Sequence, residues 1–430
     1  MSLLAVPAII KVLGTLLFIL LVTTFARQLL LAIGGGIVVL ALWCGLSPAE
    51  SATIAWERFS STNNVSLLLI VFLVVWLSSQ MAATGMMSDL VSAVRQRLTQ
   101  RSTLAALPAI IGMLPMPGGA IFSAPLVDRC DEEKRLDGPL KTRINYWFRH
   151  VWEYWWPLYP GVLLAVELSG FEIWQFMLLQ LPLTVFAVVS GWAFILRKVP
   201  RQERRREDDS SSQHRIPALV APLLTVIALY VIVRIAFPGV ARLSKYLPMA
   251  IGLVGGIALQ QCMRPLSSTG WKKIVLSRRT LLLAAVVAAV RVYGAFIEAD
   301  PAGSSSLVEQ MRIELDAWGI PVLALLVVIP FISGLTTGLA IGFVGASFPI
   351  VFSLLGPEPA LAHRAATVVL AYAAGYAGMI LSPVHVCLVV TNEHFRTNLG
   401  QSIVHLVKPV AVVAVAATLL AGCYYVLLPG

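Results

Sequence analysis

Long runs of apolar residues, separated by short polar segments, dominate this chain. A run of about 18 or more apolar residues with few charges is long enough to cross a bilayer as a helix. We therefore expect an all-α polytopic membrane protein. The pattern predicts ten spans, over residues 7–25, 28–46, 65–83, 145–168, 173–196, 216–237, 246–263, 280–297, 364–390 and 403–428.

Prolines interrupt two of these spans near their middle. Residues 145–168 contain Pro157 and Pro160, and residues 364–390 contain Ser382-Pro383. Proline removes a helical hydrogen bond, and its ring clashes with the preceding turn. We therefore expect a broken helix in each of the two spans.

Two further apolar segments contain helix-breaking or flexible sequences in their middle. Residues 104–126 contain PMPGG (115–119), and residues 321–355 contain SGLTTG (333–338). The spans before and after each segment place both of its ends on one membrane face. We expect two re-entrant hairpins, with 104–126 entering from the cytoplasm and 321–355 entering from outside.

The polar segment 201–215 divides the chain into halves with five predicted spans each. An odd number of spans inserts the second half upside down. The sequence thus predicts two inverted-topology repeats, residues 1–200 and 216–430, each with one hairpin and one broken helix. Residues 201–215 would form a cytoplasmic linker between them.

Composition and charge agree with membrane insertion. The chain is 58% hydrophobic and 13% charged, with a mean hydropathy of +0.83, whereas soluble domains are about one quarter charged. Its net charge of +10 arises from Lys and Arg that gather in loops on one side of the predicted spans. The positive-inside rule makes that side cytoplasmic, places both termini outside and accounts for the charge without a nucleic-acid partner. We expect a multi-pass protein of the cell inner membrane.

The five cysteines form no CxxC pair and no Cys/His group with metal-binding spacing along the chain. The sequence therefore predicts neither a metal site nor a disulfide framework, and it indicates no cofactor. It also contains no HExxH or GxSxG motif, which makes an enzyme the less favoured class.

The predicted interruptions are the candidate binding site. A broken helix exposes backbone N–H and C=O groups, which the membrane tolerates only where protein or a water-filled cavity satisfies them. Paired breaks in two repeats are the best sequence indication of a transport site. The alternative is that the prolines only kink their spans and the small residues pack helices closely. The candidate residues at the tips and breaks are Pro117, Gly118, Gly119, Ser123, Pro157, Tyr159, Ser333, Gly334, Thr336, Thr337, Gly338, Ser382, Pro383 and His385.

Three ionisable residues within the spans are further candidates. His150 and Glu153 are three residues apart, so on one helix they would share a face leading to Pro157 and form a proton relay. The alternative is that Glu153 pairs with Arg149 near the interface. Arg291 would be a counter-charge for an anionic substrate, or it would pair with a carboxylate such as Glu298.

Three motifs resemble a family of uncharacterised ten-span bacterial and archaeal membrane proteins in the ion transporter superfamily. They are GMLPMPGGAIFSAPL (112–126), NYWFRHVWEYWWPLYPG (145–161) and GYAGMILSPVHVCL (375–388). The resemblance implies a homodimer that carries organic or inorganic anions by an elevator mechanism, coupled to Na⁺ or H⁺. The dicarboxylate members have Ser-Asn-Thr signatures at both hairpin tips, and this chain departs from that pattern.

The function expected from these features is secondary active transport of a small anion, driven by H⁺ or Na⁺. The expected partners are the anionic substrate, membrane lipid and a second copy of the chain. The first hairpin tip carries no side-chain oxygen, while histidine titrates near neutral pH, so the residues favour H⁺. The alternative function is that of an intramembrane enzyme or a lipid-handling protein.

Overall fold

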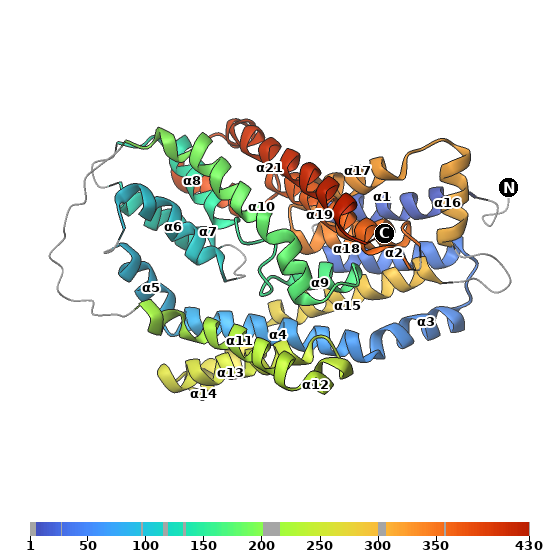
Figure 1. Ribbon diagram of the computed structural model, residues 1–430, viewed down its shortest axis with the longest axis horizontal. Helices are drawn as coiled ribbons and strands as arrows, with labels where there is room; N and C mark the ends of the chain where they lie inside the picture. Colours follow the sequence, from blue (N-terminus) through green and yellow to red (C-terminus); the bar gives the residue numbers. More distant parts are fainter. Residues whose placement is uncertain are drawn as a thin grey trace.

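The computed structural model describes residues 6–26, 28–95, 98–114, 119–131, 135–200, 216–299, 307–356 and 358–429. These residues form helices and connecting turns without a strand, which confirms the expected all-α class. Six described helices are long and apolar enough to cross a membrane, or seven if one bent pair counts as a single span. The chain is thus a multi-pass helical membrane protein (Figure 1).

The helices that precede residues 201–215 include three of the predicted spans as single long helices, α1, α4 and α10. The helices of this part are α1 (Ala8–Ala26), α2 (Leu29–Trp43), α3 (Pro48–Ser60), α4 (Thr62–Ala83), α5 (Met86–Arg95), α6 (Gln100–Gly112), α7 (Ala120–Arg129), α8 (Gly138–Arg149), α9 (Pro160–Leu168), α10 (Ile173–Phe194) and the short η2 (Leu196–Lys198).

The helices that follow residues 201–215 include three more, α11, α15 and α21. The helices of this part are α11 (Ile216–Ala236), α12 (Pro238–Leu243), α13 (Leu247–Met263), α14 (Ser268–Val275), α15 (Arg278–Glu298), α16 (Leu307–Ala317), α17 (Val322–Thr337), α18 (Ala340–Ser353), α19 (Leu361–Ile380), α20 (Val386–Phe395) and α21 (Leu399–Leu427). The pair α6 and α7 is called the first hairpin below, and the pair α17 and α18 the second hairpin.

Four of the ten predicted spans do not form single helices of full length. The helices α2 and α13 are apolar but have only 15 and 17 residues. The span 145–168 is divided into α8 and α9, and the span 364–390 into α19 and α20. The expected interruption is therefore present in both divided spans.

Several helix contacts in one half have a counterpart in the other. In the first half α1 packs on α2 and α6 packs on α8, while in the second half α11 packs on α13 and α17 packs on α19. Contacts between the halves correspond in the same way, because α4 packs on α13 and α2 on α15, while α7 packs on α20 and α18 on α9. Figure 1 shows α4, α11 and α13 running together along one side of the molecule.

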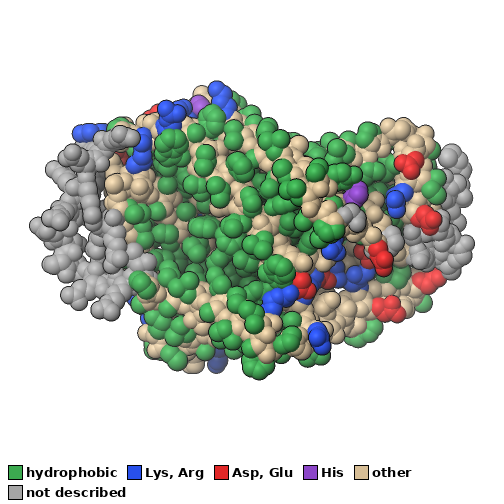
Figure 2. Space-filling model, viewed as in Figure 1, with side chains coloured by type: hydrophobic (Ala, Val, Ile, Leu, Met, Phe, Trp, Pro, Cys, Tyr) green, Lys and Arg blue, Asp and Glu red, His purple; other side chains and the backbone are tan. Residues whose placement is uncertain are grey.

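Large apolar side chains cover much of the outer surface. Leu17 on α1, Val189 on α10 and Val415 on α21 are all more than half exposed. Figure 2 shows hydrophobic side chains over most of one face, with charged side chains gathered mainly toward its ends and in one hollow. Such a surface is stable in lipid, where its burial from water supplies the driving force.

Glycines bring the second hairpin and the broken span beside it into close contact. A Cβ atom on Gly334 of α17 would collide with the carbonyl oxygen of Gly375, and a Cβ atom on Gly378 of α19 would collide with that of Phe331. The two backbones therefore approach more closely than any other residue would allow. This is the small-residue packing that membrane helices use in place of a hydrophobic driving force.

Gly378→Ala should therefore lower the thermal unfolding midpoint of the purified protein. The added methyl group meets backbone atoms that cannot move aside, and overpacking of this kind costs about 1–3 kcal/mol. Gly34→Ala is the matched control, because a Cβ atom there meets nothing within 4 Å and alanine favours a helix. Equal melting of the two variants would contradict the close-packing interpretation.

Candidate functional site

The two breaks and the two hairpins meet inside the protein. The second arm of each hairpin packs on the far half of the opposite broken span, α7 on α20 and α18 on α9. At the start of α9, a Cβ atom on Gly161 would lie 2.8 Å from Cβ of Ala340, the first residue of α18. Segments distant in sequence thus form one buried region.

The first break begins earlier than the sequence indicated. The helix α8 ends at Arg149, and residues 150–159 form turns before Pro160 begins α9. The expectation that His150 and Glu153 lie on one helical face is therefore wrong, because both follow the end of α8. Pro157 is buried within the unwound segment, and its position alone does not explain where the helix ends.

Tyrosine hydroxyls from the second broken span satisfy the unwound backbone. Tyr376 donates to the His150 carbonyl at 2.6 Å, and Tyr372 donates to the Glu153 carbonyl at 2.6 Å. In the reverse direction Tyr146 of α8 donates to the carbonyl of Ile380, at the end of α19, at 3.0 Å. These tertiary bonds replace the helical bonds that the break removes, which explains why the chain can unwind before Pro157.

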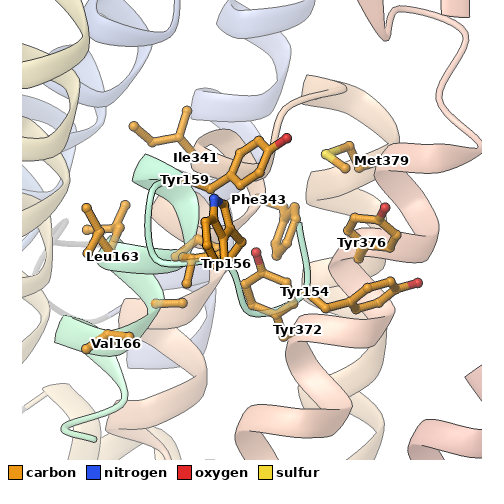
Figure 3. Close-up of a cluster of buried hydrophobic side chains, with 14 of the residues drawn as sticks. Tyr154, Trp156, Tyr159, Leu163, Val166, Ile341, Phe343, Tyr372, Tyr376 and Met379 are labelled. Atoms are coloured by element: carbon orange, nitrogen blue, oxygen red, sulfur yellow. The ribbon is translucent and has the colours of Figure 1, made fainter. Parts of the chain in front are cut away.

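Two aromatic residues of the break also bond the first hairpin. Tyr159 donates to the Gly112 carbonyl, and Trp156 Nε1 donates to the Met113 carbonyl at 2.9 Å. Figure 3 shows Tyr154, Trp156 and Tyr159 beside Tyr372 and Tyr376 in one aromatic cluster. The break is therefore held on both sides by aromatic side chains.

Arg149 lies where the first hairpin meets this break. The residue is 3% exposed, and a Cβ atom on Gly119 would lie 2.6 Å from both of its Nη atoms. Gly119 is the N-cap of α7, so the guanidinium lies at the positive end of that helix. The sequence suggests Arg149 only as a partner for Glu153. Its position beside the first hairpin depends on the tertiary fold, so sequence spacing could not reveal it.

The second hairpin meets the second break at Gly338. This residue adopts the left-handed conformation (φ 60°), and a Cβ atom on it would lie 2.9 Å from the backbone nitrogen of His385. Ser382 donates to the Leu335 carbonyl at 2.6 Å and so attaches the break to α17. Both the turn and the close approach require glycine at position 338.

The other hydroxyl candidates of the second tip have local roles. Thr336 donates to the Ile332 carbonyl at 2.8 Å, and Thr337 donates to the Ser333 carbonyl at 2.6 Å. Ser123 and Ser333 are fully buried, and their hydroxyls have no hydrogen-bond partner among the residues that the structure describes. Pro383 is exposed within the break. Pro117 and Gly118 lie outside the described residues.

Polar side chains from both halves converge between the breaks. The ligating atoms of His150, His385 and Cys387 all lie within 4.8 Å of one another, and all three residues are buried. Glu153 Oε1 lies 3.9 Å from His150 Nε2. Arg149 also faces the Cys387 sulfur. The sequence spacing did not reveal this cluster, because His150 and Cys387 are more than 200 positions apart. The only local indication of a metal-binding group was the short motif His385-Val-Cys387 beside a predicted break.

Arg291 does not reach this cluster among the contacts described. It forms an ion pair of 2.7 Å with Glu167, which also pairs with Lys245 at 3.1 Å and accepts from the Tyr246 hydroxyl at 2.7 Å. The expected alternative of a carboxylate partner is therefore correct, but the partner is Glu167. Glu298, the partner suggested by the sequence, pairs instead with Arg58 at 2.5 Å.

The fold and the site together define a multi-pass helical membrane protein whose buried polar site lies between two interrupted spans. The chain belongs to the DUF401 family of proteins of unknown function, whose family model matches residues 9–426. No curated protein matches the chain. Among solved structures, it is similar to the Alcanivorax borkumensis YdaH transporter, with a TM-score of 0.55 and 14% identity over 86% of this chain and 87% of that one.

The similarity to YdaH extends over nearly all of both chains and concerns the fold alone. At 14% identity it assigns no residue and no substrate to this protein. YdaH is a transporter of unusual topology, and the overall arrangement of this chain is similar to it.

The tyrosine bonds across the breaks should contribute measurably to stability. Tyr376→Phe removes the side-chain donor of the buried His150 carbonyl, which keeps only the backbone N–H of Glu153 at 3.1 Å, and loss of a hydrogen bond typically costs about 0.5–1.5 kcal/mol. We expect a lower melting midpoint in detergent, whereas the exposed Tyr425→Phe should melt like the wild type. Unchanged melting of Tyr376→Phe would show that the break is held by other contacts.

Proposed function

We propose that this protein is a secondary active transporter of a small organic or inorganic anion. The observation that carries the proposal is the buried guanidinium of Arg149 at the contact between the first hairpin and the first break. A cation inside a membrane protein is costly, and it is found where it pairs or binds a ligand. Similarity of fold to a known transporter supports the same class.

An anion is favoured by the groups around Arg149. The guanidinium offers several N–H donors in a planar fork that matches carboxylate, phosphate or sulfate oxygens. The N-terminus of α7 adds partial positive charge at Gly119, and absence of a side chain there leaves its backbone accessible at close range. The proposed substrate therefore binds between the hairpin tips and the breaks.

The proposed architecture is a pair of inverted repeats, residues 1–200 and 216–430. The matched helix order and the exchanged contacts between halves support it. In this arrangement the hairpin of α6 and α7 enters from the cytoplasm, and the hairpin of α17 and α18 enters from outside. Both termini lie outside the inner membrane. The linker 201–215, proposed to be cytoplasmic, lies outside the described residues.

The proposed mechanism is an elevator, in which the hairpins and broken spans move together against a scaffold that dimerises. One group of ion pairs connects these parts in the present conformation. Glu167 at the end of α9 pairs with Arg291 of α15 and with Lys245. The Glu167 pairs would have to break when the core slides, so they would mark one state of the cycle.

The driving ion of the proposed transporter is H⁺ or Na⁺. His150 and Glu153 lie 3.9 Å apart at the break, in keeping with the relay suggested by sequence, while unwound carbonyls are ligands that Na⁺ accepts. Uptake into proteoliposomes under a pH gradient and under a Na⁺ gradient separates the two.

Proteoliposome uptake of labelled phosphate, sulfate and small mono- and dicarboxylates should identify at least one transported anion. For that anion Arg149→Gln should lower the apparent affinity by about 30-fold or more, since loss of a buried charged partner costs about 2 kcal/mol or above. Arg149→Lys should retain part of the uptake. The exposed Arg242→Gln is the control.

Correct folding of the Arg149 variants must be checked by melting and size-exclusion chromatography. Wild-type uptake by folded Arg149→Gln would contradict the proposed substrate site. Absence of flux for every anion tested, under both gradients, would contradict transport of this class.

The elevator proposal predicts two distances between the core and the scaffold. Spin labels at exposed Ile121 on α7 and exposed Leu276 before α15 should give two populations that shift when substrate and the driving gradient are added. The pair Leu276 and Val254, both in the proposed scaffold, should give one unchanged distance. Constant separation of Ile121 and Leu276 with a variable scaffold pair would favour a rocking mechanism instead.

A further inference from the structure

We infer that His150, His385 and Cys387 form a binding site for a transition-metal ion of the zinc type, with Glu153 as the oxygen ligand. The site combines residues of both broken spans: His150 follows α8, and the other two begin α20. The inference goes beyond anion transport and does not depend on it. With the ion bound, His150 and Glu153 are ligands and cannot relay a proton, so the metal-loaded protein would leave Na⁺ as the driving ion.

The donor set matches the chemistry of such an ion. Imidazole nitrogen and thiolate sulfur are the ligands that Zn²⁺ and related borderline-soft ions prefer, and two histidines with one cysteine and a carboxylate complete four coordination. Neither Na⁺ nor Mg²⁺ favours sulfur. The residues therefore select against the common hard cations of the cell.

The separations are compatible with one shared ion. Ligands of a tetrahedral zinc ion stand roughly 3.3–3.6 Å apart, given bonds of about 2.0–2.3 Å. The three ligating atoms already lie within 4.8 Å of one another, and Glu153 Oε1 lies 3.9 Å from His150 Nε2. Closure by about 1 Å, through side-chain rotation, brings the two histidines and the cysteine to bonding distance, and Glu153 beside His150 would rotate in as the fourth ligand.

The outer hydrogen bonds fix both imidazoles in the orientation that a metal needs. His150 Nδ1 lies 2.6 Å from the Tyr146 carbonyl, and His385 Nδ1 lies 3.3 Å from the Met379 carbonyl. A carbonyl only accepts, so Nδ1 carries the proton in each ring and the Nε2 lone pair remains for an ion. Metal-bound histidines characteristically donate their second nitrogen to a carbonyl in this way.

The charges around the site permit a divalent ion beside Arg149. The Cys387 thiolate and the Glu153 carboxylate would offset the two charges of the ion, and Arg149 also interacts with the Cys387 sulfur. Burial of all three primary ligands makes an uncompensated ion costly. With the ion bound, the cluster and Arg149 together keep one positive charge, so the metal site does not conflict with an anion at the hairpin tips.

Cobalt titration of the purified full-length protein, stripped with a chelator, tests the inference without a transport assay. Co²⁺ bound by thiolate and imidazole in tetrahedral geometry gives intense visible bands and a sulfur-to-metal charge-transfer band. We expect one equivalent per chain, displaced by Zn²⁺. Cys387→Ser should remove the charge-transfer band. Each of Cys387→Ser and His385→Gln should weaken Co²⁺ binding by more than about 100-fold, because loss of an outer-shell hydrogen-bond partner alone already weakens metal binding by up to about that factor.

The chain provides matched cysteine controls. Cys44→Ser alters another buried thiol and Cys262→Ser an exposed one, and both should leave the cobalt spectrum unchanged. Zn²⁺ should also raise the melting midpoint of the wild type but not that of His385→Gln. This second measurement tests the site even if Cys387→Ser folds poorly.

Absence of a charge-transfer band in folded wild-type protein would overturn the inference, and so would Co²⁺ binding that survives both Cys387→Ser and His385→Gln. Because these readouts are equilibrium measurements in detergent, a protein that carries anions but binds no metal would refute only the metal site. A protein that binds metal but carries no anion would refute only the proposed transport.

Discussion

The structure depends on satisfying backbone groups where two helices are interrupted inside an apolar environment. Each unpaired carbonyl in such surroundings costs several kcal/mol, because no water is present to replace the lost hydrogen bond. Tyr372 and Tyr376 of α19 meet this requirement for the first break, and Tyr146 of α8 meets it for the second. The breaks therefore stabilise one another, and neither would be stable without the opposite half of the chain.

This mutual support also determines where the polar side chains lie. Since α8 ends at Arg149, the following residues leave the helical path, and His150 comes against His385 with ring centroids 4.8 Å apart. Glycines at 119 and 338 then let the hairpins approach Arg149 and His385 closely. A cation, two imidazoles, a thiol and a carboxylate are thereby concentrated in one buried region, although the fold around them is overwhelmingly apolar.

A second group of charged side chains, around Glu167, lies outside this region and forms ion pairs within the protein. Glu167 is surrounded by Arg291, Lys245 and Tyr246, so its charge is fully compensated within the protein. Such compensated pairs hold elements together without recruiting a ligand. Its ion pair with Glu167 gives Arg291, the basic residue most deeply placed in its predicted span, a role in holding elements together, whereas the substrate role that we propose for Arg149 rests on its position where the first hairpin meets the first break.

The sequence by itself determined the all-α membrane class, the positions of most spans and the existence of the two breaks. Hydrophobic run length and proline chemistry act locally, so they can be recognised without a structure. The exact point where α8 ends, the pairing of Arg291 with Glu167, and the meeting of His150 with His385 and Cys387 were decided only by tertiary structure. These features depend on contacts between residues far apart in the chain, and no local spacing records which half-helix will lie beside which.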